Sequence, residues 1–225
     1  MAYKLNADAP KIIAEACSNI GSQLIHLSTD YVFDHDGKEL LDENLSMNPK
    51  SIYGKSKSLG EKYIIESTSK YIILRTSWIY SDIGKNFYLT IKNLLKSNNQ
   101  IGVVNDQFGA PTLANDLVGG IIDIIKFIED KKNKEIDLKN IYGVYNITNK
   151  GNISWFDFAC KIAESLNHLS SERITAISST EFGAAAPRPF NSRLDNSKLK
   201  KVFGIELINW ESSFKNFLKT SNIRK

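Results

Sequence analysis

Tyr53 and Lys57, in the segment SIYGKSKSLGEKY (51–63), are a pair that could donate a proton during the reduction of a ketone. A ketone that accepts a hydride develops negative charge on its oxygen, and a positioned proton donor stabilises that charge. The pKa of a free tyrosine is about 10, and a nearby lysine ammonium would lower it by favouring the phenolate. On a helix, residues four positions apart share one face, so both side chains can point into one cleft.

The same spacing also arises without any chemistry. Tyr88 and Lys92, in YLTIK, repeat the pattern, and a chain with nine tyrosines and many lysines produces Tyr-x-x-x-Lys by chance. The simpler alternative is that Tyr53 packs against its neighbours and Lys57 is solvated. Spacing alone does not decide between these alternatives.

The segments that precede this tyrosine favour the chemical alternative. Pro49 and Ser51 are helix start signals, so the pair is predicted to lie on a helix. Upstream, the apolar run QLIHLST predicts a buried strand that ends at Thr29. Ligands of open α/β sheets gather at the carboxyl ends of the strands. Thr29 is therefore a candidate to hydrogen-bond a substrate oxygen, and Lys57 is a candidate to hold a cofactor ribose.

Unbroken apolar runs alternate with helix-like segments along the chain, which indicates an α/β fold. Such runs are typical of strands that are covered on both faces of a parallel sheet. The predicted strands are QLIHLST (23–29), KYIILRTSW (70–78) and GVYNIT (143–148). The predicted helices are ADAPKIIAEACSNIG (7–21), which stops at Gly21, KSLGEKYIIESTS (57–69) and LANDLVGGIIDIIKFIEDKK (113–132).

The last third of the chain carries one further clear helix pattern. SWFDFACKIAESL (154–166) has apolar residues at helical spacing, and Ser154 is a suitable N-cap. The mixed-charge run EDKKNKEIDLKN (129–140) is predicted to be an exposed loop.

Composition restricts the classes of function. The 225 residues, 42% of them hydrophobic, can form one large domain, or one domain with a small lobe. The charges behind the net +4 are scattered, so nucleic-acid binding is not expected. Cys17 and Cys160 lie far apart and the three histidines share no ligand spacing, so no metal site is expected. Asp123 and Lys126 interrupt the most apolar segment, so we expect a cytoplasmic protein without a membrane span.

Five motifs occur in order along nearly the whole chain. They are HLSTDYVFD (26–34), YGKSKSLGE (53–61), ILRTSWIY (73–80), NDQFGAPT (105–112) and RPFNSRLD (188–195). Together they resemble the dTDP-4-dehydrorhamnose reductases, which are part of the extended short-chain dehydrogenase/reductase family. Sugar epimerases of that superfamily share the Ser/Thr, Tyr and Lys residues but do not usually combine the other motifs.

The resemblance implies a fold and a reaction. The fold would be an incomplete Rossmann-type parallel sheet made of the C-terminal strands, in residues 1–150, with a small C-terminal substrate lobe in residues 151–225. The reaction would transfer a hydride from NADPH or NADH to the 4-keto group of dTDP-4-dehydro-L-rhamnose, in the biosynthesis of nucleotide sugars and cell-surface polysaccharide.

The resemblance also assigns roles to catalytic residues. Tyr53 would be the proton donor, Lys57 its partner and the anchor of the cofactor ribose, and Thr29 the hydroxyl at the keto oxygen. Asp30 and Trp78 match positions that contact the sugar nucleotide in that family. Two simpler alternatives stay open, since Trp78 could belong to the core and Asp30 could cap a turn.

Two further motifs supply candidates for substrate binding. Arg188 could contact the diphosphate, because a guanidinium suits phosphate oxygens, or it could form a structural ion pair. Gln107 and Thr112 could shape the substrate lobe, or Gly109 and Pro111 could simply form a turn.

One feature of that family is missing from this sequence. Its members open with a strand and a glycine-rich turn that binds the cofactor pyrophosphate, and no such motif follows a predicted strand here. The strand 23–29 would then lie at a bare sheet edge, and such edges invite pairing with another chain. We therefore expect either a homodimer or a separate chain that supplies the N-terminal half. The alternative functions are a non-catalytic regulatory or binding subunit and an inactive fragment.

Overall fold

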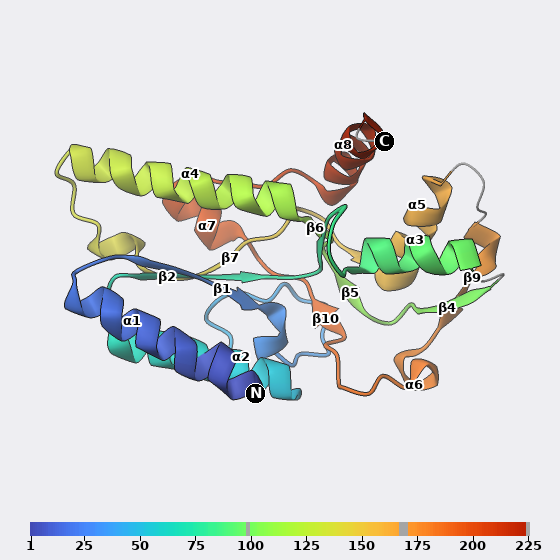
Figure 1. Ribbon diagram of the computed structural model, residues 1–225, viewed down its shortest axis with the longest axis horizontal. Helices are drawn as coiled ribbons and strands as arrows, with labels where there is room; N and C mark the ends of the chain where they lie inside the picture. The colour runs from blue at the N-terminus through green and yellow to red at the C-terminus, as the bar shows by residue number, and fades with distance from the viewer. Residues whose placement is uncertain (98–99, 167–170, 224–225) are drawn as a thin grey trace.

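A parallel three-stranded sheet forms the centre of the protein in a computed structural model that describes residues 1–97, 100–166 and 171–223 (Figure 1). The strand order is β1 (Leu24–Thr29), β2 (Tyr71–Thr76) and β7 (Gly143–Asn146). Thr29 lies opposite Thr76, so the carboxyl ends of β1 and β2 meet at one edge of the sheet. The fold class is α/β, as the alternation of apolar runs predicts.

Helices cover both faces of this sheet (Figure 1). One face carries α1 (Ala9–Asn19), which continues a π-helix at Lys4–Asp8, and α2 (Ile52–Ser67). The other face carries α4 (Ala114–Asn133) and α7 (Ser197–Phe203). Consecutive side chains of β2 pack on opposite faces of the sheet. Ile73 packs with Ala14 and Ile64 on the side of α1 and α2, while Ile72 and Leu74 pack on the side of α4 and α7.

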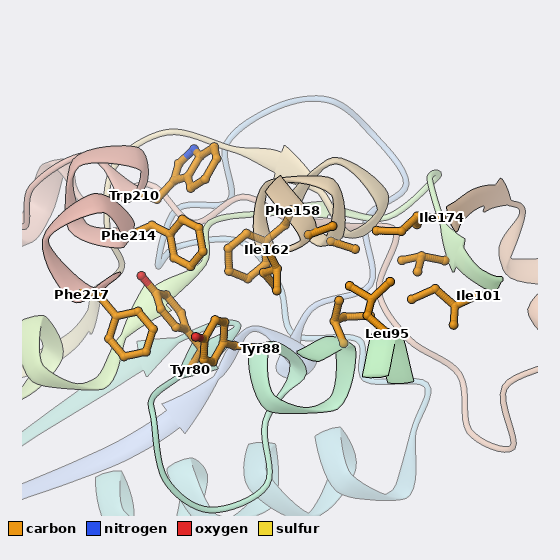
Figure 2. Close-up of a cluster of buried hydrophobic side chains, with 14 of the residues drawn as sticks. Tyr80, Tyr88, Leu95, Ile101, Phe158, Ile162, Ile174, Trp210, Phe214 and Phe217 are labelled. Carbon is orange, nitrogen blue, oxygen red and sulfur yellow. The ribbon is translucent and has the colours of Figure 1, made fainter. Parts of the chain in front are cut away.

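A second core lies beside the sheet and is rich in aromatic side chains (Figure 2). It is enclosed by α3 (Phe87–Ser97), α5 (Trp155–Glu164) and α8 (Trp210–Ile223), together with the parallel pair of β4 (Ile101–Val104) and β9 (Ile174–Ile177). Tyr80, Tyr88, Phe158, Phe214 and Phe217 meet there in edge-to-face contacts, a geometry that aromatic rings favour.

Short elements connect the two cores. The pairs are β3 (Ile79–Tyr80) with β6 (Thr112–Leu113), and β5 (Phe108–Gly109) with both β8 (Ile153–Ser154) and β10 (Asn191–Ser192). The remaining short helices are Asp30–Val32, Lys139–Ile141, Ser171–Arg173 and α6 (Ser179–Phe182). Through β5 and β10, the motifs NDQFGAPT and RPFNSRLD lie side by side.

The predicted helix boundaries are confirmed where the caps are local. The Ser51 hydroxyl accepts a hydrogen bond from the Gly54 amide at 3.0 Å, and the Ser154 hydroxyl accepts one from the Asp157 amide at 3.0 Å. Gly21 has a φ of +70°, a conformation that ends α1 two residues after Asn19.

Two predicted boundaries are wrong. The run 129–140 is not all loop, because α4 continues to Asn133 and a further helical turn covers Lys139–Ile141. Lysine and glutamate are good helix formers, and Lys134 pairs with Asp130 at 2.9 Å across the end of α4. The helix that carries Tyr53 ends at Ser67, two residues before the predicted end.

Strand β1 is less covered than its apolar sequence predicts. Leu27 is 42% exposed, and within the described residues β1 pairs with β2 alone, so its other edge has no partner strand there. The sheet around β1 thus comprises three strands in the described part of the chain, in keeping with the incomplete Rossmann-type sheet that the family resemblance implies. The expected bare edge is present.

The division at residue 150 stays a prediction. Side chains from both sides of this residue pack into the same aromatic core, as Tyr88 and Phe214 do. Likewise α7, which lies after residue 150, packs with β2 and β7.

Candidate active site

Thr29 and Tyr53 meet at the carboxyl end of β1. Thr29 is the last residue of that strand, and Tyr53 lies in the first turn of α2. Gly54 allows this approach, since a Cβ there would lie 2.1 Å from the Tyr31 carbonyl oxygen. The Tyr53 ring packs edge-to-face on Tyr31 at 5.4 Å, and its hydroxyl lies close enough to the Thr29 side chain for Thr29 to affect the pKa of the phenol. The structure therefore brings together two of the three predicted catalytic residues.

The pKa of the Tyr53 phenol is raised above its ordinary value of 10.0. Burial is the largest cause and the Asp30 charge adds to it, while the hydrogen bond with Thr29 acts in the opposite direction. The expectation that Lys57 lowers this pKa is wrong in this structure, because burial prevails. A raised pKa keeps the phenol protonated at neutral pH.

Lys57 lies against β1, one turn further along α2. Its ammonium donates to the Leu27 carbonyl oxygen at 2.6 Å and lies 3.2 Å from His26 Nε2. Burial lowers the pKa of Lys57, and the charge of Glu61 opposes that shift. Burial and the Lys57 charge lower the pKa of His26 to about 4, so the imidazole is neutral at pH 7. The solvated-lysine alternative does not hold, because Lys57 is only 9% exposed.

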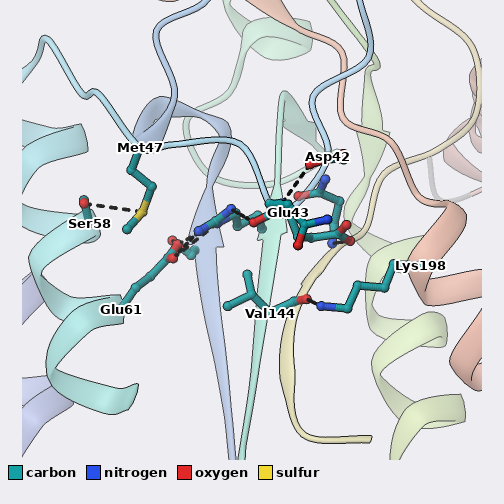
Figure 3. Close-up of polar contacts among 11 residues, drawn as sticks. Asp42, Glu43, Met47, Ser58, Glu61, Val144 and Lys198 are labelled. Carbon is teal, nitrogen blue, oxygen red and sulfur yellow. Dashed lines mark hydrogen bonds and ion pairs between the residues drawn. The ribbon is translucent and has the colours of Figure 1, made fainter. Parts of the chain in front are cut away.

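A buried charge cluster fixes α2 on the strands (Figure 3). Arg75 of β2 forms a forked pair with Glu61 of α2, with Nη2 to Oε2 at 2.7 Å and Nε to Oε1 at 3.0 Å. Ser28 of β1 donates to the same carboxylate at 2.5 Å. Glu61 is fully buried and Arg75 is 3% exposed. The cluster therefore ties β1, β2 and the helix that carries Tyr53 into one unit.

Sequence reasoning missed this cluster, although a signal was present. An arginine inside the apolar strand YIILRT has to be buried, and a buried charge needs a partner. Glu61, which ends the motif YGKSKSLGE one helical turn after Lys57, was the available carboxylate.

Asp30 lies behind Thr29 and is 2% exposed. Its carboxylate accepts hydrogen bonds from the Thr29 hydroxyl at 3.0 Å and from the Ser192 hydroxyl at 2.5 Å. Burial raises its pKa to about 6, against the effect of these hydrogen bonds. The turn that follows β1 is capped by the Thr29 hydroxyl, which accepts from the Tyr31 amide at 3.2 Å. The side chain of Asp30 therefore fixes the orientation of the Thr29 and Ser192 hydroxyls.

Asp30 and His26 make opposite contributions to the pH dependence of stability. The folded protein holds the Asp30 proton more tightly than the unfolded chain does, so this contribution is full below pH 3.8 and is lost as pH rises to about 6. His26 binds its proton less tightly in the folded protein, so its contribution is full above pH 6.5 and is lost as pH falls to about 4. The two slopes oppose each other between pH 4 and 6.

Asp30→Asn should remove the contribution of Asp30 to the pH dependence of stability and leave that of His26. Between pH 6 and 4 the free energy of unfolding of the variant should fall more steeply with acidification than that of wild type, by on the order of 3 kcal/mol. Urea unfolding at a series of pH values measures this difference. Parallel profiles for the two proteins would show that the Asp30 pKa is not raised by folding.

Trp78 and Arg188 come from different segments, Trp78 from just after β2 and Arg188 from between α6 and β10. Trp78 is half-buried and stacks on Trp155, with ring centroids 3.5 Å apart and an interplanar angle of 10°. Arg188 is exposed, and its guanidinium lies 5.7 Å from the centre of the Phe182 ring. In the described part of the chain no carboxylate forms an ion pair with Arg188, so the ion-pair alternative is not supported.

A hollow of about 310 Å³ lies next to Arg188. Its lining includes Lys50, Gln107, Phe182 and Phe190. The Gln107 amide donates to Ser179 at 2.8 Å, while its Oε1 is buried and has no hydrogen-bond partner among the described residues. A buried acceptor without a partner fits a site that receives a donor from a ligand. Thr112 does not face this hollow, since its buried hydroxyl donates to the Ala110 carbonyl oxygen at 3.2 Å.

Neither a metal-binding cluster nor a membrane-spanning helix is present in the described ranges. Across residues 1–97, 100–166 and 171–223, histidine, cysteine and carboxylate side chains do not gather in any group of three that could hold a metal ion. Within the same residues, every helix is too short or too polar to cross a bilayer.

Comparisons with known proteins identify the family. The family model described as "RmlD substrate binding domain" matches residues 1–223. The dTDP-4-dehydrorhamnose reductase of Aggregatibacter actinomycetemcomitans is 36% identical over 220 residues, which cover 96% of this chain and 72% of that protein. The chain belongs to the dTDP-4-dehydrorhamnose reductase family.

Solved structures of this family confirm the Rossmann-type fold. The dTDP-4-dehydrorhamnose reductase of Clostridium acetobutylicum is 37% identical with a TM-score of 0.87, over 98% of this chain and 73% of that one. The Bacillus anthracis reductase, solved in complex with NADP, is 37% identical with a TM-score of 0.83, over 96% of this chain and 72% of that one. The family resemblance stated from the five motifs is confirmed.

Proposed function

We propose that this protein reduces the 4-keto group of dTDP-4-dehydro-L-rhamnose with NADPH or NADH, forming dTDP-L-rhamnose in the cytoplasm. The observation that carries the proposal is the placement of Thr29 and Tyr53 at the carboxyl end of β1, with Lys57 one helical turn further along α2, in a chain of the reductase family. Relatives named dTDP-4-dehydrorhamnose reductase and the NADP complex of the Bacillus anthracis enzyme support the substrate and the cofactor.

Tyr53 would give its proton to the keto oxygen. Its raised pKa keeps that proton in place until negative charge develops on the substrate, and the neighbouring Thr29 hydroxyl can hydrogen-bond the same oxygen. In the structure Thr29 donates to Asp30, so its hydroxyl has to rotate toward the substrate, as hydroxyl groups do freely. The nicotinamide supplies the hydride when the cofactor is bound.

The residues present fit the ribose end of the cofactor. Lys57 has three donors on its ammonium, and the described contacts of that ammonium are the Leu27 carbonyl oxygen and His26 Nε2. One donor is therefore left to hold a ribose hydroxyl beside Tyr53. The neutral ring of His26 adds no charge that would repel the ammonium.

The hollow next to Arg188 would receive the nucleotide. Arg188 and Lys50 bring positive charge for a diphosphate, and the unpaired Oε1 of Gln107 can accept the N–H of a pyrimidine base. Asp30 and Trp78 would border the sugar, Asp30 through the hydroxyls it holds and Trp78 through its ring. The lobe that starts near residue 151 would thus contribute Arg188 to the site.

The reaction is tested by following reduced-nicotinamide absorbance with dTDP-4-dehydro-L-rhamnose as substrate. Turnover that requires both substrates supports the proposal. If no turnover occurs, fluorescence titrations of NADPH and of dTDP separate the alternatives, since a non-catalytic subunit retains ligand binding and an inactive fragment loses it. Absence of turnover by any assembly containing this chain would contradict the proposal.

We further propose that another strand pairs with the outer edge of β1, supplied by a second copy of this chain or by a separate chain. The exposed side chain of Leu27 in β1 and the exposed apolar side chains Ile12 and Ile13 of α1 would be covered in that way. Sedimentation velocity should therefore show self-association, or a shift when the separate chain is present. A stable monomer at all concentrations, with no affinity for another chain of the pathway, would rule this out.

A further inference from the structure

The backbone of Trp78 is held in a conformation that bulky residues rarely adopt. Its φ is +50°, in the left-handed region that favours glycine. It lies two residues after β2, and its carbonyl oxygen accepts the Thr112 amide at 3.1 Å. Such a conformation persists only where surrounding contacts fix it, and it is common at ligand sites.

Two neighbours fix the indole ring. Trp155, the first residue of α5, lies flat on it at 3.5 Å, and Phe87 packs on Trp155 at 4.2 Å. The backbone of Gly109 lies against the same indole, since a Cβ at that position would be 2.7 Å from Cε2 and 2.9 Å from Nε1. A side chain at position 109 would push the ring away.

A continuous series of contacts joins this ring to the catalytic hydroxyls. Gly109 of β5 pairs with Ser192 of β10, and Ser192 donates to Asp30 at 2.5 Å. Asp30 accepts from Thr29 at 3.0 Å, and Thr29 in turn affects the pKa of Tyr53, the proposed proton donor. These contacts connect the Trp78 ring, through Gly109 and Ser192, to Asp30 and Thr29, which supports the proposed place of Trp78 at the sugar of the substrate.

We infer that Trp155 is a positioning residue that holds the Trp78 indole in place as a stacking surface for the sugar ring of the substrate. This inference rests on the proposed function. It concerns the sugar alone, because the hollow next to Arg188 that would receive the nucleotide is lined by other residues. Trp155 itself contacts Trp78 and Phe87 and acts through the indole.

A purely structural role for Trp155 predicts something different. Trp155 also packs against the aromatic core, so its removal would lower stability in either case. A loss of packing alone would affect dTDP and dTDP-L-rhamnose binding equally, or neither. A positioning role affects only the ligand that carries the sugar.

Isothermal titration calorimetry of the chain with dTDP and with dTDP-L-rhamnose separates these roles. Trp155→Leu, which stays apolar but is smaller and cannot stack, should bind dTDP-L-rhamnose about tenfold more weakly than wild type, a loss of about 1.4 kcal/mol. Its affinity for dTDP should stay within about twofold. Trp155→Phe restores an aromatic face and should recover most of the affinity. Gly109→Ala displaces the ring independently and should reproduce the loss.

The results distinguish the inference from the function on which it rests. Unchanged dTDP-L-rhamnose affinity in folded Trp155→Leu, or an equal loss for both ligands, would overturn the inference while the proposed function stands. Failure of the wild-type protein to bind either ligand would overturn the proposed function and the inference together. Near-UV circular dichroism confirms that each variant is folded and reports the loss of the stacked indole pair.

Discussion

Replacement of Tyr53 by phenylalanine should lower kcat at least about a hundredfold, because general acid catalysis by a positioned side chain contributes about 10² to 10⁴ to a rate. The variant keeps the ring that packs on Tyr31 at 5.4 Å and loses the hydroxyl whose pKa Thr29 affects. The affinity for dTDP-L-rhamnose should change little, since the proton is needed only in the transition state. Steady-state kinetics with reduced nicotinamide and dTDP-4-dehydro-L-rhamnose measure the effect.

The chain contains a matched control for this substitution. Tyr88 has the same spacing to a lysine, but it is 3% exposed and packs in the aromatic core against Phe214 and Phe217. Tyr88→Phe should therefore leave kcat within about twofold of wild type, as it removes no group from the site. Equal activity of Tyr53→Phe and wild type would show that another group donates the proton.

Local signals explain why much of the fold could be predicted from the sequence. The caps at Ser51 and Ser154 are formed between residues three positions apart, so the sequence contains both partners of each hydrogen bond. The apolar runs that became β1, β2 and β7 were visible in the same way. The helix pattern 113–132 predicted the end of α4 to within one residue, whereas the interpretation of 129–140 as a loop was wrong, because charged residues are compatible both with a loop and with an exposed helix end.

The electrostatics of the site could not be predicted from residue types. The spacing of Tyr53 and Lys57 suggested that the ammonium lowers the phenol pKa, whereas the folded chain directs Lys57 onto Leu27 and His26. Burial then sets the direction of the Tyr53 shift. Burial is a property of the whole fold, so no local pattern carries it.

Contacts between segments far apart in the chain could not be predicted from the sequence either. Ser192 and Asp30 are 162 positions apart, and the Trp78 and Trp155 rings meet only because β3, β5 and β6 bring the two cores together. The motif containing Ser192 was recognised as a segment, but nothing in its composition assigned that hydroxyl to Asp30. The candidate site is therefore predictable in its residue types and only partly predictable in its arrangement.

Glu61→Gln should lower the free energy of unfolding by about 3 to 5 kcal/mol, because it leaves the Arg75 guanidinium charged and unpaired in the interior. Arg75 is 3% exposed and its forked pair with Glu61 is the contact that neutralises it. Urea unfolding followed by circular dichroism at neutral pH measures the loss. Glutamine matches glutamate in shape, so the change isolates the charge.

An ion pair on the same helix shows why burial decides the size of this effect. Glu66 pairs with Lys62 at 3.8 Å, and both side chains are more than half exposed. Glu66→Gln should therefore change stability by less than about 1 kcal/mol, since water already solvates both charges. A similar loss for the two variants would contradict the argument that desolvation makes the Glu61 partner essential.

A double replacement of Glu61 and Arg75 removes both charges of the buried pair. Replacing Glu61 and Arg75 together by leucine and methionine should recover much of the stability lost in Glu61→Gln, because no charge is then left buried without a partner. Activity should not recover to the same degree. Glu61 raises the pKa of Lys57 against the effect of burial, so its loss removes an opposite charge that favours the ammonium of the residue that would anchor the cofactor ribose. A double variant that is stable but binds NADPH weakly would show that Glu61 supports the cofactor anchor separately from its effect on stability.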